Sequence, residues 1–108
     1  MGTQIYRDYR DQSRMEESEV SVLRLPYTAS LLLMIYDEEE IIASQMKRIC
    51  KNYTTMASLA KRLEEEGLVE VVMRTSPRIT HIYFLSDEGN RVAEKLREVE
   101  ELINGDPD

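Results

Sequence analysis

Apolar side chains in the first half of the chain recur every three to four residues, which is the spacing of one buried helix face. Between Pro26 and the acidic run 37–40, the apolar positions at this spacing are Leu31, Leu32, Ile35 and Tyr36. Proline fixes φ and has no N–H group to leave unpaired, so Pro26 suits the first turn of a helix. The pattern predicts a first helix over Tyr27–Tyr36.

A second helix is predicted after a short apolar step at Ile41 and Ile42. The Ser44 hydroxyl can accept a hydrogen bond from a free N–H group of the next turn, which makes it a good N-cap. We therefore expect a helix over Gln45–Lys51 that buries three side chains: Met46, Ile49 and Cys50.

A third helix is predicted directly afterwards, with Asn52 as its N-cap. It runs over about Tyr53–Glu66 and ends at Gly67, which can adopt a positive φ without steric cost. Its apolar residues fall at i, i+3, i+4 and i+7: Met56, Leu59, Ala60 and Leu63. Two helices separated by about two residues are typical of a helix-turn-helix unit.

A hairpin and a last helix complete the pattern. The β-branched runs Leu68–Arg74 and Ile79–Leu85 flank a basic turn, which predicts two antiparallel strands. Ser86 then caps a helix over 87–104. Its apolar stripe exceeds what a short hairpin can cover, so we expect dimerisation through Val92, Leu96, Val99 and Ile103.

The 108 residues have room for one domain, expected over 19–104. Residues 1–18 are polar with nearly balanced charges, which predicts a flexible or weakly ordered arm. Met1–Arg14 lacks the apolar segment of a signal peptide, and the apolar run Ala29–Tyr36 is far shorter than the roughly 20 residues that a bilayer requires. We expect a cytoplasmic protein with no membrane partner.

Residue chemistry argues against an enzyme. A single Cys50 excludes an internal disulfide, and together with the single His81 it makes a metal site implausible. Cys50 is interpreted as a small buried hydrophobe, and His81 as structural or at a dimer edge. The carboxylates 38–40 and 64–66 are consecutive rather than paired across one helical face, so they do not suggest an acid/base pair. No cofactor is expected.

Net charge is unevenly distributed along the chain. The formal charge of −7 alone would argue against nucleic acid. Residues 1–43 hold four basic and nine acidic side chains, residues 44–81 seven and four, and residues 82–108 three and eight. Within the basic middle, Ser44–Arg62 holds five cations and no acid, which marks a candidate anion-binding face.

Three short motifs occur in order between residues 54 and 89. Leu63–Val69 is L-E-E-E-G-L-V, Tyr83–Gly89 is Y-F-L-S-D-E-G, and Thr54–Met56 is T-T-M. These motifs resemble those of winged helix-turn-helix transcription regulators of the MarR type. Thr54–Met56 resembles the start of the recognition helix, Leu63–Val69 the junction between this helix and the wing, and Tyr83–Gly89 the entry to the final helix. The resemblance covers roughly 26–103.

The resemblance implies an α+β, mainly helical fold with a two- to three-stranded antiparallel wing sheet and a long C-terminal helix. It also implies a homodimeric regulator that binds double-stranded DNA, with the helix 53–66 in the major groove and the wing 74–79 on the flanking groove or backbone. The side chains expected to contact DNA are Gln45, Lys47, Arg48, Lys51, Tyr53, Thr54, Thr55, Ser58, Lys61, Arg62, Arg74, Ser76 and Arg78.

Several alternatives stay open at this point. The basic segment is also compatible with an ordinary solvated helix face. The main alternative function is a winged-helix module that binds protein and not DNA. RNA binding ranks last, because the six tyrosines are scattered and form no stacking surface. Nothing in the sequence indicates a small-molecule effector.

Overall fold

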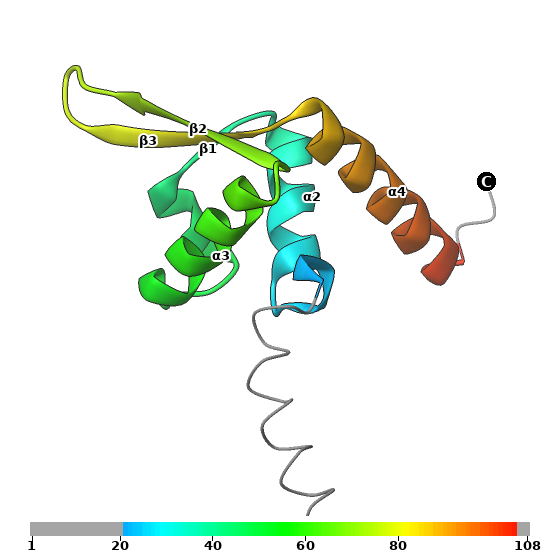
Figure 1. Cartoon of the computed structure of the whole chain (residues 1–108). Coiled ribbons are helices and arrows are strands. Elements are labelled where there is room, and N and C mark those ends of the chain that lie inside the picture. Colours follow the sequence, from blue (N-terminus) through cyan, green and yellow to red (C-terminus); the bar gives the residue numbers. More distant parts are fainter. Residues whose placement is uncertain (1–20, 106–108) are drawn as a thin grey trace, which may run out of the picture.

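The computed structural model describes residues 21–105, so the arm expected over 1–18 lies outside the described residues. Three α-helices, two short 3₁₀-helices and one small sheet make up this part of the chain (Figure 1). The elements are η1 (Val22–Arg24), α2 (Thr28–Glu38), β1 (Ile41–Ile42), η2 (Ala43–Arg48), α3 (Tyr53–Glu65), β2 (Val69–Arg74), β3 (Thr80–Leu85) and α4 (Asp87–Ile103), where η marks a 3₁₀-helix.

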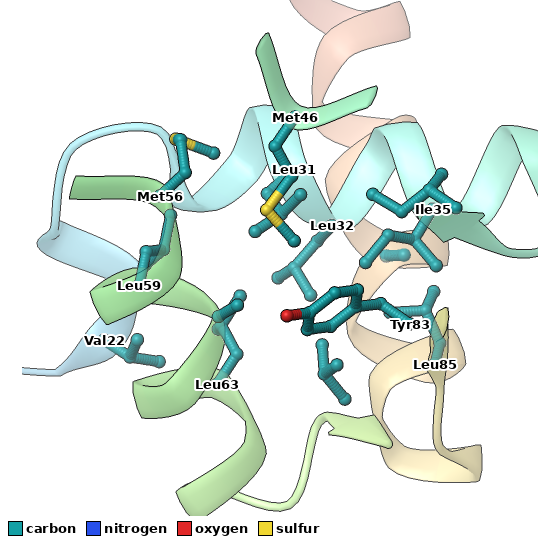
Figure 2. Packing of buried hydrophobic residues seen from close by; sticks show 14 residues of the cluster. Val22, Leu31, Leu32, Ile35, Met46, Met56, Leu59, Leu63, Tyr83 and Leu85 are labelled. Atoms are coloured by element: carbon teal, nitrogen blue, oxygen red, sulfur yellow. The ribbon is translucent and has the colours of Figure 1, made fainter. Parts of the chain in front are cut away.

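Helix α2 supplies the centre of the core and stands between α3 and α4 (Figure 1). Leu31, Leu32 and Ile35 are at most 1% exposed. Figure 2 shows them surrounded by side chains of α3 and β3, with the Tyr83 ring projecting from β3 into the same cluster. Full burial of each such side chain is worth about 1.5–3 kcal/mol, so α2 holds the other elements together.

The first helix starts one residue later and ends two residues later than predicted. The helix begins at Thr28 because Tyr27 adopts a left-handed conformation with φ of +72°, which places Pro26 before the helix and not in its first turn. The buried Thr28 hydroxyl donates to the carbonyl of Val22 at 2.7 Å and fixes this entry. The helix continues to Glu38, because Asp37 and Glu38 find cationic partners instead of ending it.

The second helix differs from its prediction in type, bounds and cap. It is a 3₁₀-helix over Ala43–Arg48 and not an α-helix over Gln45–Lys51. Ser44 lies inside it, and the capping role belongs to Gln45, whose Oε1 accepts from the Ile42 N–H at 2.7 Å. Met46 is buried as expected, whereas Ile49 and Cys50 lie beyond the helix and are half-buried.

The third helix is confirmed, one residue shorter than predicted at its end. All four members of the predicted stripe are buried, with Met56 and Leu63 fully inaccessible. Gly67 has φ of +82°, a conformation that other residues adopt only with strain. The chain therefore leaves α3 in the direction that β2 requires.

The sheet has three antiparallel strands in the order β1-β3-β2. The hairpin pairs from Val69 opposite Leu85 to Arg74 opposite Thr80, and Ile41 pairs with Tyr83. The predicted hairpin is confirmed, and the apolar step at Ile41 and Ile42 proves to be the third strand. The free end of the hairpin extends beyond α3 (Figure 1).

The junction between β3 and α4 is closely packed. As predicted, Ser86 caps α4, with its Oγ accepting from the Gly89 N–H at 3.0 Å. The same hydroxyl donates to the Gly67 carbonyl at 2.6 Å, which ties the two ends of the hairpin together. A Cβ on Gly89 would lie 2.0 Å from the backbone oxygen of Leu68, so this position has no room for a side chain.

Among the helices of residues 21–105, none is both long and apolar enough to cross a membrane.

Gly89→Ala is expected to lower the free energy of unfolding by roughly 1–3 kcal/mol or more, because backbone must shift to admit the methyl group. Urea unfolding of the full chain measures the change. Asn90→Ala, at the next and exposed position, is the control and should stay within about 0.5 kcal/mol of the parent chain. Equal stability of the two variants would contradict the close packing of this junction.

Candidate nucleic-acid interface

The exposed side of α3 carries an ordered row of polar side chains. Thr54, Ser58, Lys61 and Glu65 follow one another at i, i+4, i+7 and i+11, so they share one face of the helix. All four are exposed, and the buried stripe of Met56 and Leu63 lies on the opposite side. We call these four residues the outer stripe of α3.

The start of α3 is fixed by the predicted cap. Asn52 Oδ1 accepts from the Thr55 N–H at 3.1 Å, and Asn52 itself is extended. This bond satisfies one of the free N–H groups of the first turn and positions Thr54 and Thr55 at the exposed end of the helix. Asn52 therefore acts as a cap, as the sequence indicates.

One flank of α3 borders an open hollow of about 540 Å³. Thr55 and Arg62 lie on this flank, one helix face away from the outer stripe. Arg62 Nε donates to Glu66 Oε2 at 3.0 Å, so its guanidinium is held along the helix. The lining residues are Leu25, Pro26, Asn52, Thr54, Thr55, Ser58, Leu59 and Arg62.

The other flank of α3 faces the sheet. Burial raises the pKa of Tyr83 on β3, and nearby Tyr53 and Glu64 raise it further. Tyr53 and Glu64 thus lie on the side of α3 next to β3, and Tyr53 is 57% exposed. A molecule bound against the outer stripe would meet Tyr53 between the helix and the hairpin.

The cations before α3 fall into two groups. Lys47 and Lys51 are exposed, and neither forms an ion pair within residues 21–105. Arg48 instead forms an ion pair with Glu38, and Gln45 Nε2 donates to the same carboxylate at 3.2 Å. Arg48 also lines a groove between α2 and α4, not the hollow beside α3. The structure therefore gives Gln45 and Arg48 partners inside the chain.

The hairpin end carries the remaining predicted contacts. Arg74, Ser76 and Arg78 are all exposed, and the two arginines make no ion pair in the described part of the chain. Two apolar side chains, Met73 and Ile79, are exposed beside them. The end of the hairpin thus presents both cationic and apolar groups to a partner.

The predicted dimerisation stripe on α4 is divided in the structure. Val92 and Leu96 are half-buried and pack against the core, whereas Val99 is 50% and Ile103 75% exposed. Arg97 on the same helix binds Asp37 of α2 and Glu100, and its hydrogen bond to Asp37 raises the Arg97 pKa. The first half of α4 is therefore fixed to the core, and its second half leaves an apolar surface uncovered.

Three contacts were missed by the sequence interpretation. The sequence interpretation assigns no partner to the acidic run 37–40, yet Asp37 binds Arg97 and Glu38 binds Arg48. Cys50 is half-buried, and a side-chain hydrogen bond with Cys50 raises the pKa of Tyr27.

His81 is exposed on β3 opposite Met73, and no group of three potential metal ligands occurs in residues 21–105.

Comparisons with known proteins show the fold. No protein-family model matches the chain, and no curated protein matches it. A transcriptional regulator homologue from Pyrococcus horikoshii OT3 matches over 86% of this chain and 96% of its own, at 19% identity and a TM-score of 0.67.

Two further solved structures match the chain with similar TM-scores. A Listeria monocytogenes protein described as a MarR family transcriptional regulator, complexed with 26mer DNA, matches over 96% of this chain and 71% of its own, at 21% identity and a TM-score of 0.66. The reduced form of the transcriptional regulator YodB from B. subtilis matches over 85% and 91%, at 17% identity and a TM-score of 0.63. The chain has the winged helix-turn-helix fold that the motifs predicted.

Asn52→Ala is expected to lower the free energy of unfolding by about 1 kcal/mol, because the first turn of α3 loses its cap. Thermal or urea unfolding measures the loss. Ser44→Ala is the matched control, because the Ser44 side chain caps no helix here, and it should leave stability nearly unchanged. A larger loss from Ser44→Ala than from Asn52→Ala would refute this assignment of the caps.

Proposed function

We propose that the chain is a non-enzymatic, sequence-specific double-stranded DNA-binding transcription regulator that acts as a homodimer in the cytoplasm. Helix α3 enters the major groove, and the hairpin end contacts the flanking groove or backbone. The observation that carries this proposal is the outer stripe of α3, with exposed cations on the segments that precede and follow the helix: Lys47, Lys51, Arg74 and Arg78.

The dimensions of α3 fit this role. Its 13 residues extend for about 20 Å, and B-DNA has a major groove about 12 Å wide that admits one helix. The hydroxyls of Thr54, Thr55 and Ser58 can bond base edges or phosphates, and Lys61 can bind guanine or phosphate. The free N–H groups at the start of α3 favour a phosphate there.

The surrounding polar groups would fix the position of the duplex. Lys47 and Lys51 lie before α3 and suit phosphates on one side of the groove, with Tyr53 on the other flank. Arg74, Ser76 and Arg78 suit the adjacent backbone or minor groove. Gln45, Arg48 and Arg62 would have to exchange or share the acidic partners that they hold in the free protein. The Listeria structure with bound DNA supports this use of the fold.

A protein-binding module is the second candidate, and exposed apolar groups on the hairpin favour it. Met73 is 56% and Ile79 67% exposed, and a protein partner would cover such side chains. The two candidates differ in their dependence on Lys61, which a DNA-binding surface requires and an interface on the hairpin does not.

Lys61→Glu is expected to weaken binding to duplex DNA by about ten-fold or more, because a phosphate-facing cation becomes an anion. The experiment first selects a preferred sequence from random duplexes at about 150 mM salt and then measures its affinity across salt concentrations. A dimer with 6–10 phosphate contacts should lose roughly 10³- to 10⁵-fold in affinity between 50 and 200 mM salt.

Lys95→Glu on α4 is the matched control, with the same change of charge away from α3. Lys95 lines the hollow beside Val99, so sedimentation must show that this variant has the oligomeric state of the parent chain. Lys95→Glu should leave DNA affinity close to that of the parent chain. If no sequence is enriched, or if affinity hardly responds to salt, the DNA-binding proposal is wrong and the protein-binding module gains weight.

The uncovered second half of α4 supports the proposed homodimer. A twofold dimer through this surface would present two α3 helices to half-sites about 34–36 Å apart, or a multiple of that distance, in an inverted repeat. Leu23 of η1 borders the same apolar hollow as Val92, Leu96 and Val99, which extends the surface beyond one helix.

Val99→Glu combined with Ile103→Glu is expected to convert the dimer to a monomer, because both side chains are exposed in the single chain and would be buried between two copies. Sedimentation at micromolar concentration measures the change, and circular dichroism checks that the fold persists. Glu94→Gln, at an exposed α4 position outside this stripe, should leave the dimer intact. A parent chain that sediments as a monomer would refute the proposal.

A further inference from the structure

Three consecutive glutamates end α3, and each has a different environment. Glu66 accepts from Arg62, and Glu64 lies on the flank next to Tyr83. Glu65 is exposed and forms no hydrogen bond or ion pair within residues 21–105, not even with Lys61 one turn earlier. Of the three carboxylates, only Glu66 has a hydrogen-bond or ion-pair partner among residues 21–105, and Glu65 is the one that lies on the outer stripe.

Glu65 is also the last member of the outer stripe. It follows Lys61 at i+4 and Thr54 at i+11, so it faces the same direction as the side chains proposed to enter the groove. With a rise of about 1.5 Å per residue, Glu65 lies about 6 Å beyond Lys61 along the axis of α3, which is about one helical turn. A duplex that contacts the stripe at Thr54 and Lys61 therefore also passes Glu65.

A carboxylate in this position discriminates between bases because it can only accept hydrogen bonds. Guanine presents two acceptors in the major groove, and thymine presents one acceptor and a methyl group. Adenine presents its amino donor beside the N7 acceptor, which repels the second carboxylate oxygen. Cytosine presents the N4 amino donor without an acceptor of its own beside it, and it is the base that glutamate recognises best.

We infer that Glu65 is a specificity-determining residue that accepts a hydrogen bond from the N4 amino group of a cytosine near the C-terminal end of α3. The inference rests on the proposed DNA-binding function and adds to it one defined base in each half-site. When another base replaces the cytosine, the Glu65 carboxylate has no hydrogen-bond donor and is only repelled by the phosphates. The carboxylate therefore weakens binding to sequences without this cytosine. Its effect is therefore on the choice of sequence, whereas Lys61 contributes to affinity for all sequences.

Glu65→Ala and Glu64→Ala provide a matched pair of variants, with the same loss of charge at adjacent exposed positions of one helix. Sequences are selected from random duplexes with the parent chain and with both variants. Kd is then measured for the preferred duplex and for the three duplexes that replace the cytosine and its partner. For the parent chain, each replacement should weaken binding by about 5- to 150-fold.

With Glu65→Ala, the four duplexes should bind within about two-fold of one another, and every other position of the preferred sequence should be retained. Glu64→Ala should keep the cytosine preference. Glu64→Ala should bind all four duplexes somewhat more tightly, because it removes a negative charge near the backbone. Glu65→Ala should gain affinity mainly for the three replaced duplexes, because for the cytosine duplex the loss of the hydrogen bond offsets the loss of the charge. Circular dichroism of both variants checks that the helices are retained.

Two results would overturn the inference in distinguishable ways. If the parent chain enriches a sequence and Glu65→Ala enriches the same one with the same discrimination, Glu65 does not choose a base, although the DNA-binding function stands. The same conclusion follows if Glu64→Ala changes the preference as much as Glu65→Ala does. If the parent chain enriches no sequence, the proposed function fails and the role of Glu65 fails with it.

Discussion

The burial of α2 on several sides is the constraint on which the rest of the molecule depends. Leu31, Leu32 and Ile35 are inaccessible to solvent, so every element beside α2 must turn an apolar face toward it. For α3 that face is the stripe containing Met56 and Leu63. Because the apolar stripe faces inward, the outer stripe must face solvent. The packing that stabilises the fold therefore also orients the polar side chains of α3 toward solvent.

The elements that could be predicted are those in which local and periodic signals agree. In α3, the cap at Asn52, the buried stripe and the glycine after the helix all indicate the same segment, and the hairpin and α4 have similarly clear ends. The 3₁₀-helix η2 differs because its start depends on distant groups. Ile42 pairs with Ile82, and Gln45 closes the first turn, whereas the local signal at Ser44 points to another start. A six-residue element with one buried side chain has too little periodicity to resolve the difference.

For the candidate site, the sequence predicts which side chains of α3 are exposed, but it does not predict which cations form ion pairs within the chain. Helical spacing correctly places Thr54, Ser58 and Lys61 on the solvent side of α3, whereas Arg62, expected to contact DNA with them, is half-buried on the flank. It does not reveal that Arg48 binds Glu38, ten residues away, or that Arg97 binds Asp37, sixty residues away. Such contacts arise only when the packing of α2 brings its C-terminal end close to η2 and α4. A sequence interpretation therefore treats all cations as equally available, whereas the fold distinguishes them.

This distinction decides how the charge of the protein bears on binding. A cation that leaves a carboxylate to bind a phosphate exchanges one ion pair for another, so Arg48 contributes less to affinity than its charge suggests. Six cations have no ion pair in residues 21–105, one of which is Arg24 of η1. In the proposed complex, counterion release would depend mainly on the other five: Lys47, Lys51, Lys61, Arg74 and Arg78. Helix α4, with most of its acidic side chains exposed, stands across α2 from α3 (Figure 1). Screening reduces interactions between exposed charges beyond about 8 Å, so the net charge of −7 would slow the approach to DNA more than it would weaken the proposed complex.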